Sequence, residues 1–143
     1  MVQRVAEAEW QGPLKNGNGI MKLGSGAFQG AYSFGTRFGT DKGTNPEELL
    51  GAAHAGCFSM ALALMLGQAG FVPRRIRTTA KVDIEEKGGG FQITRIHLDT
   101  QAVVPGINEE KFREQAEAAK RDCPLSRALA STPITLTARV AES

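Results

Sequence analysis

The chain has 143 residues, with 17 Lys and Arg against 15 Asp and Glu, which gives a net charge of +2 at pH 7. This length suffices for one domain with a real core, and we expect a single domain over residues 1–143. The near-balanced charge favours neither a nucleic-acid-binding surface nor a polybasic membrane patch. Residues 1–10 are polar and mixed in charge, unlike a secretory signal, so we expect a cytoplasmic protein.

Strands and glycine-rich turns are expected in the N-terminal part of the chain. Residues 3–10 alternate as a strand does, and Asn-Gly-Asn-Gly at 16–19 is a hairpin turn signal. The stretch 24–43 is rich in glycine, as dinucleotide-binding loops are. Such a loop must lead into a helix, whereas residues 32–38 alternate as a strand would. We therefore expect N-terminal strands across residues 3–38 and no nucleotide site.

The longest apolar segment runs from Gly43 to Leu66 and predicts a helix over residues 46–67. Asn45 is a favourable N-cap, and Pro46 fits the first helical position. Nearly every face of this helix is apolar, which is typical of a buried core helix or of a membrane span. No aromatic belt or cationic cluster flanks it, so we expect a buried helix and no membrane association. So small a chain has little surface with which to cover such a helix on every side, which indicates a dimer.

The remainder of the chain predicts a hairpin, two helices and a last strand. The strand pair spans residues 76–104 and turns at three consecutive glycines, 88–90. Between Ile93 and Ile96 the apolar phase shifts, which indicates a β-bulge. The other elements are helices within 108–130, the second with Pro124 at its first position and Cys123 at its cap, and a terminal strand over 132–141. This order of elements predicts an α+β fold.

Two cysteines, Cys57 and Cys123, are the candidate reactive residues. In a cytoplasmic protein such a pair is either inert or redox-active. Cys57 lies in the middle of the apolar helix, and it becomes reactive only where a cation lowers its pKa. Cys123 precedes a helix, where its thiolate is favoured, although a plain capping role is an equal alternative. Neither cysteine forms a zinc-binding spacing with His54 or His97, so we expect no metal site.

Arg37, just ahead of the central helix, is the natural cation for Cys57, unless it is a solvated strand residue. A carboxylate would have to hold its guanidinium in place. At ~100° per residue, Glu48 lies about 180° from Cys57 around the helix, and Glu47 only about 80° away. Glu47 is also about 15 Å from Cys57 along the axis, so either Arg37 spans part of the gap or a second subunit brings Glu47 close. His54 is either a base for Cys57 or a structural residue.

Several motifs resemble the osmotically inducible protein C / organic hydroperoxide resistance family. The segment from Gly43 to Leu62 and Cys-Pro-Leu-Ser at 123–126 carry the resemblance, while Trp10, residues 36–38 and residues 104–107 resemble the osmotically inducible protein C branch. The resemblance covers essentially the whole chain. It implies an intertwined α+β homodimer, with two antiparallel β-sheets wrapped around long buried central helices.

The resemblance also implies a thiol-dependent peroxidase, an organic hydroperoxide reductase that acts in oxidative and osmotic stress defence. In this family pattern Cys57 is the peroxidatic cysteine and Cys123 the resolving one. Arg37 stabilises the thiolate and the peroxide, and Glu47 orients Arg37. The implied partners are an organic hydroperoxide and a dithiol reductant such as a lipoylated protein, with no cofactor, metal or nucleic acid.

Two other functions fit the same residues. One is a peroxide-responsive redox sensor that uses the Cys57–Cys123 disulfide as a switch without turnover. The other is a small-molecule-binding protein in which both thiols are unreactive. Stoichiometric oxidation without turnover would favour the sensor, and the absence of any sulfenic acid under peroxide would favour the binding protein.

Overall fold

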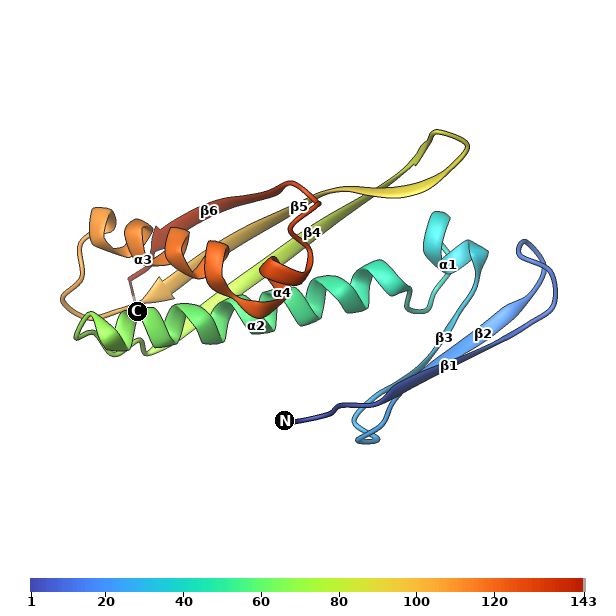
Figure 1. Cartoon of the computed structure of the whole chain (residues 1–143), viewed down its shortest axis with the longest axis horizontal. Coiled ribbons are helices and arrows are strands. Elements are labelled where there is room, and N and C mark those ends of the chain that lie inside the picture. The colour runs from blue at the N-terminus through green and yellow to red at the C-terminus, as the bar shows by residue number, and fades with distance from the viewer. Residues whose placement is uncertain (143) are drawn as a thin grey trace. The chain divides into compact units, whose positions relative to one another are not determined.

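The computed structural model describes residues 1–142 (Figure 1). The chain divides into two compact units, Met1–Leu49 and the part from Leu50 onward, here called the N-terminal and C-terminal units. Each unit contains one three-stranded sheet together with helical segments. The α+β class expected from the order of elements is therefore confirmed. The expectation that the whole chain acts as one domain stays a prediction.

The N-terminal unit is built on an antiparallel meander of strands β1 (Ala6–Gln11), β2 (Asn18–Leu23) and β3 (Gln29–Tyr32). On this sheet the rings of Trp10 and Tyr32 pack across β2 with their centroids 5.4 Å apart. Gly19 lies between them, and a Cβ there would come within 2.7 Å of both rings. A glycine at this position thus lets two aromatic side chains from the outer strands meet.

The strand expected over residues 32–38 is wrong, because helix α1 (Phe34–Phe38) occupies most of it. Ser33 is the N-cap: its hydroxyl accepts from Thr36 N at 3.2 Å, and Thr36 Oγ1 accepts from Ser33 N at 2.8 Å. This reciprocal capping box satisfies two backbone donors and begins a helix in spite of the alternating pattern. As a consequence, Arg37 lies in the last turn of α1 and not on a strand.

The central helix α2 spans Pro46–Gln68, as predicted. Asn45 caps it, with Oδ1 accepting from Glu48 N at 2.8 Å. By length and composition α2 could span a membrane, and 28% of an apolar 18-residue stretch of it is buried in the single chain. One face is buried, and the opposite face exposes Met60 (78%) and Leu64 (58%). Within the single chain this helix is therefore covered on one face and not on every side as expected.

The sheet of the C-terminal unit combines a long hairpin with a parallel strand. Strands β4 (Arg75–Lys87) and β5 (Gly90–Val103) pair antiparallel, and a register shift leaves Thr94 without an opposite residue on β4, which confirms the predicted bulge. Strand β6 (Ile134–Val140) pairs parallel to β5. The expectation of two antiparallel sheets is therefore wrong for this one. A helical connection between β5 and β6 returns the chain to the same end of the sheet, which is what parallel pairing requires.

That connection consists of helices α3 (Glu109–Asp122) and α4 (Pro124–Ala128), close to the predicted positions. Asn108 caps α3 by accepting from Lys111 N at 2.7 Å. Cys123 is both the C-cap of α3 and the N-cap of α4, so its backbone is extended between the two helices. The sequence Cys-Pro therefore fixes a sharp break at this point, because proline suits the first turn of a new helix.

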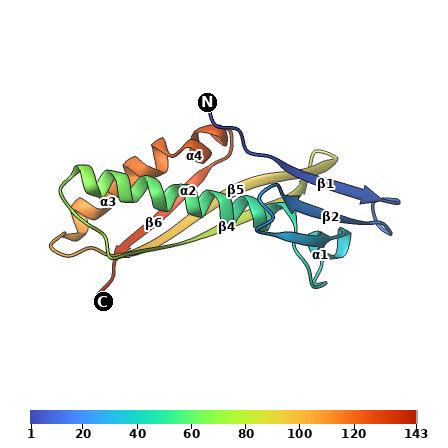
Figure 2. The ribbon, with the colours of Figure 1, turned by 90° about the horizontal axis from the view of Figure 1, so that it is seen from below.

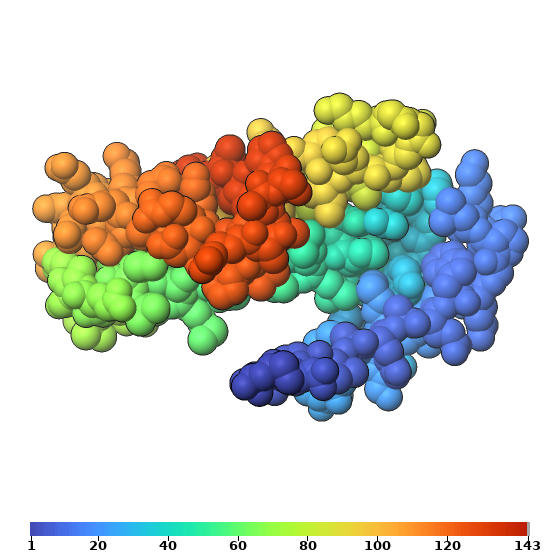
Figure 3. Space-filling model, viewed as in Figure 1, coloured from blue at the N-terminus to red at the C-terminus, as the bar shows by residue number. Residues whose placement is uncertain are grey.

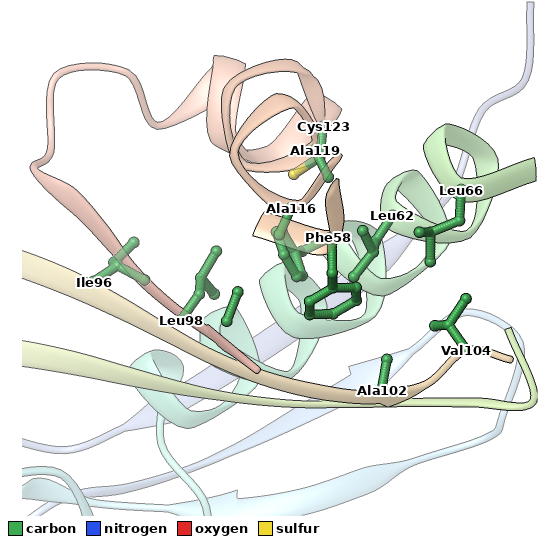
Figure 4. Close-up of a cluster of buried hydrophobic side chains, with 12 residues drawn as sticks. Phe58, Leu62, Leu66, Ile96, Leu98, Ala102, Val104, Ala116, Ala119 and Cys123 are labelled. Atoms are coloured by element: carbon green, nitrogen blue, oxygen red, sulfur yellow. The ribbon is translucent and has the colours of Figure 1, made fainter. Parts of the chain in front are cut away.

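The core of the C-terminal unit lies between the sheet and helices α2 and α3, which cover one face of it (Figures 1 and 2). In the space-filling view the side chains of α3 and α4 lie directly beside the second half of α2 (Figure 3). Figure 4 shows Phe58 and Leu62 of α2 pointing into this core, with Ala119 of α3 and Cys123 beside it. Full burial of side chains such as Phe58 stabilises the fold by ~1.5–3 kcal/mol each. Cys123 is thus held by core packing.

Candidate active site

Arg37 and Glu47 form a two-pronged ion pair inside the N-terminal unit. Arg37 Nε donates to Glu47 Oε1 at 2.8 Å, and Nη2 donates to Oε2 at 2.7 Å. The Glu47 side chain is only 8% exposed, whereas that of Arg37 is 35% exposed. The hydrogen bond to Glu47 is the main cause that raises the pKa of Arg37, so the guanidinium remains charged. Such a fork fixes the plane of the guanidinium as well as its position.

Backbone and side-chain contacts hold α1 and the first turn of α2 in place for this pair. The Asn45 amide donates to Thr36 O at 3.1 Å, which joins the cap of α2 to α1. The linking Gly43 has a φ of +147°, and a Cβ there would lie 2.8 Å from the Thr36 side chain. Glu48, the other carboxylate of this turn, accepts from Thr44 Oγ1 at 3.0 Å. Glu47 is therefore the carboxylate that contacts Arg37.

The two thiols meet in the C-terminal unit. Cys57 of α2 is half-buried and Cys123 is fully buried, and both are free thiols. The Cys57 thiol lies close enough to the Cys123 side chain and to the backbone of Leu125 for both to influence its pKa. Burial is the largest cause that raises the pKa of Cys57, and the neighbouring Cys123 raises it further, while the Leu125 backbone acts in the opposite direction. These surroundings favour the protonated thiol at Cys57.

Cys123 is also the end of a buried row of polar groups. Ser126 approaches its Sγ twice, with the backbone N at 3.3 Å and with Oγ at 3.1 Å. His54 Nε2 lies 2.8 Å from the same Ser126 Oγ. Burial lowers the pKa of His54, so its imidazole is neutral at neutral pH. The other ring nitrogen, Nδ1, is buried without a hydrogen-bond partner among the described residues.

The structure thus brings the predicted site residues together in two pairs, Arg37 with Glu47 and Cys57 with Cys123. The pairs belong to different units of the chain. His54, considered from the sequence as a base for Cys57, hydrogen-bonds Ser126 instead. Ser126 belongs to the Cys-Pro-Leu-Ser motif noted in the sequence but has no role assigned from it, although its position three residues after the Cys123 cap is where capping interactions occur. Among residues 1–142 no three His, Cys, Asp or Glu side chains gather as a metal site would need.

The fold, with its two three-stranded sheets and long central helix, is that of solved OsmC-like and organic hydroperoxide resistance proteins. The family described as OsmC-like protein matches residues 39–138, and the chain belongs to this family. Accordingly, α2 is the core helix of a soluble fold.

Among its relatives, the chain is 49% identical to peroxiredoxin OsmC of Escherichia coli strain K12 over 129 residues, which cover 90% of each protein. An organic hydroperoxide resistance protein of Elizabethkingia anophelis has a similar structure, with a TM-score of 0.72 and 27% identity over 99% of both chains. The structure of OhrB of Bacillus subtilis, at 22% identity, shares the fold with a TM-score of 0.73 over 96% of this chain and 98% of that one. The chain is therefore a homologue of a Cys-based peroxidase.

Proposed function

We propose that this protein is a Cys-based peroxidase that reduces organic hydroperoxides to alcohols in oxidative and osmotic stress defence. The observation that carries the proposal is the contact between the Cys57 and Cys123 thiols. The chain that contains this contact is 49% identical to a peroxiredoxin over 90% of its length. Two thiols in contact can form a disulfide with little rearrangement, because a disulfide requires closely approaching cysteines.

The proposed cycle has three steps. The Cys57 thiolate attacks the distal oxygen of the hydroperoxide, the O–O bond breaks, and the departing alkoxide takes a proton to become an alcohol. Cys57 is then a sulfenic acid. Cys123 attacks its sulfur, so that a disulfide forms and hydroxide leaves with the Cys123 proton as water. A dithiol reductant, such as a lipoylated protein, finally exchanges with the disulfide and restores both thiols.

Arg37 is the proposed cation for the first step, with Glu47 holding it in position. Burial and Cys123 keep the pKa of Cys57 raised, so an added positive charge is needed to favour the thiolate. Arg37 retains its charge and is the more exposed member of its ion pair, which leaves part of the guanidinium free to contact a sulfur or a peroxide oxygen. Under this proposal the active site is complete only when the Arg37 guanidinium lies against the Cys57 thiol.

The proposed assembly is an intertwined homodimer in which the sheets wrap around paired α2 helices. Its support is the exposed apolar face of α2, formed by Met60 and Leu64. Contiguous exposed apolar surface of this kind marks an interaction site. We further propose that the two units act together as one domain, that the protein is cytoplasmic, and that it binds neither nucleic acid nor membrane.

The test is turnover of an organic hydroperoxide in the presence of a dithiol, measured as the loss of the peroxide with time. We expect multiple turnovers in the native protein and none in Cys57→Ser. In Cys123→Ser, one equivalent of peroxide should leave a sulfenic acid at Cys57 that a sulfenic-acid trap captures. Turnover that survives in Cys57→Ser would overturn the roles. Oxidation of one equivalent without turnover would instead identify a redox sensor.

A further inference from the structure

The contacts around Cys123 form one continuous row from α2 to the resolving thiol. His54 Nε2 is 2.8 Å from Ser126 Oγ, and Ser126 Oγ is 3.1 Å from Cys123 Sγ. All three side chains are buried: His54 and Cys123 are fully inaccessible and Ser126 is 5% exposed. Buried polar groups are normally hydrogen-bonded to one another, and this alone is no sign of a function. A functional role for this row therefore needs a further observation.

That feature is the direction of the donors. Ser126 N–H can only donate, so Cys123 Sγ already accepts one hydrogen bond from the backbone. His54 is neutral and carries a single ring proton. An N–H buried without a partner is rarer than a bare acceptor, and Nδ1 has no partner within residues 1–142. The proton is therefore assigned to Nε2, which donates to Ser126 Oγ.

This assignment leaves the hydroxyl proton of Ser126 free to point at Cys123. Sγ then accepts from two donors of the same residue, the backbone N–H and the side-chain O–H. Two hydrogen-bond donors aimed at the sulfur stabilise negative charge on it. The arrangement suits a sulfur that must attack, and a thiol with only a capping role would not require it.

We propose that Ser126 is a catalytic residue of the resolving step, holding Cys123 Sγ as the attacking thiolate, and that His54 is a positioning residue that orients the Ser126 hydroxyl. This inference rests on the proposed peroxidase function. The balance of the step is unchanged: an S–S bond forms, the S–O bond of the Cys57 sulfenic acid breaks, and the hydroxide leaves with the proton that Cys123 gave up. Ser126 and His54 donate hydrogen bonds and keep their protons.

The first experiment measures the acidity of Cys123 without any peroxide. In a Cys57→Ser background Cys123 is the single thiol of the chain, so the ultraviolet absorbance of thiolate, followed against pH, reports it alone. Ser126→Ala should lower its acid dissociation constant by roughly tenfold, the size expected for loss of one hydrogen bond to a charged group. The background removes Cys57, the titratable neighbour of Cys123 in the native chain, and leaves His54, which is joined to Cys123 through Ser126, while the charged sequence neighbours Asp122 and Arg127 are exposed.

A matched pair at position 54 separates orientation from packing. His54→Leu fills the site but has no donor, whereas the amide nitrogen of His54→Gln reaches the place of Nε2 and donates. We expect the leucine variant to shift the acidity of Cys123 in the same direction as Ser126→Ala, and the glutamine variant to restore most of it. Equal values in the leucine and glutamine variants, or no shift in Ser126→Ala, would overturn the inference.

The second experiment follows resolution itself. Proteins with both cysteines receive one equivalent of organic hydroperoxide, and trapped Cys57 sulfenic acid and disulfide are counted against time by mass spectrometry. The ratio of the resolution rate to the rate of Cys57 oxidation should fall about tenfold in Ser126→Ala. If the native protein forms neither a sulfenic acid nor a disulfide, the proposed function fails, whatever the titration shows. If either forms and the ratio is unchanged in Ser126→Ala, only the role of Ser126 and His54 is overturned.

Discussion

Arg37 and Glu47 are joined by two nearly equal hydrogen bonds, 2.8 and 2.7 Å long, that fix a largely buried carboxylate against a more exposed guanidinium. The two residues are only ten positions apart, and the short helix α1 turns the chain so that they face each other. A guanidinium held on one edge presents its other edge in a fixed orientation. The pair is therefore suited to positioning charge.

Replacement of Glu47 by Gln tests this use of the pair. The amide keeps the shape but loses the charge, so Arg37 is held less firmly and stabilises the Cys57 thiolate less well. We expect kcat/KM for an organic hydroperoxide to fall by roughly 10- to 100-fold, the range for loss of a hydrogen bond between charged groups. Glu48→Gln is the matched control, because Glu48 bonds Thr44 and not Arg37. Equal losses in the two variants would contradict the assignment.

Much of this arrangement follows from local sequence rules. The cap at Asn45 and the apolar run predict α2 almost to its ends, and helix geometry favours Glu47 over Glu48. The alternating pattern of residues 32–38 predicts a strand and not helix α1, because such a pattern takes no account of the Ser33–Thr36 capping box that begins the helix. Propensity and periodicity compete in such short segments, and one reciprocal cap decides the outcome.

Tertiary pairing explains the other differences. Nothing in the residues of β6 encodes that its partner β5 runs parallel to it; the path through α3 and α4 determines this. The role of Ser126 likewise depends on a tertiary contact, because its partner His54 is 72 positions away in the chain. A serine in a short helix is unremarkable until a buried imidazole and a thiol are both found beside it.

A second prediction concerns the acidity of Cys57. Cys123 raises the pKa of Cys57 through both a side-chain hydrogen bond and its charge. Cys123→Ala removes both causes, so the pKa of Cys57 should fall and its reaction with iodoacetamide at pH 8 should become faster. The rate against pH, measured on Cys57 as the single remaining thiol, gives the pKa. An unchanged pKa would show that Cys123 does not contribute to it.

A third prediction concerns stability and His54. Its pKa is lowered below the ordinary value of 6.5, because burial disfavours the imidazolium in the folded state. A group with a depressed pKa contributes stability that is present above pH 6.5 and is lost as pH falls through the folded pKa. The free energy of unfolding should therefore decrease below pH 6.5 more steeply in the native protein than in His54→Gln. Urea titrations at fixed protein concentration measure this difference.

The control for that measurement is the other histidine. His97 lies on β5 and hydrogen-bonds Thr135 and Thr137 in an exposed setting. His97→Gln should retain the steep decrease below pH 6.5 that His54→Gln reduces. If both substitutions left the slope unchanged, the buried imidazole would not be a source of acid instability, and protonation of the carboxylates would account for it.

The exposed face of α2 yields the last prediction. Met60 is 78% exposed and Leu64 58% exposed in the single chain, although both belong to the most apolar helix of the protein. If a second copy covers this face, a charge at Met60 is buried without a partner in the dimer, at a cost of several kcal/mol. Met60→Glu should thus convert the dimer to monomer in sedimentation equilibrium and lower peroxidase turnover with it. Val72→Glu, at a position 79% exposed outside the helix, adds the same charge and should leave the mass unchanged. A Met60→Glu protein that sediments as native dimer would place the interface elsewhere.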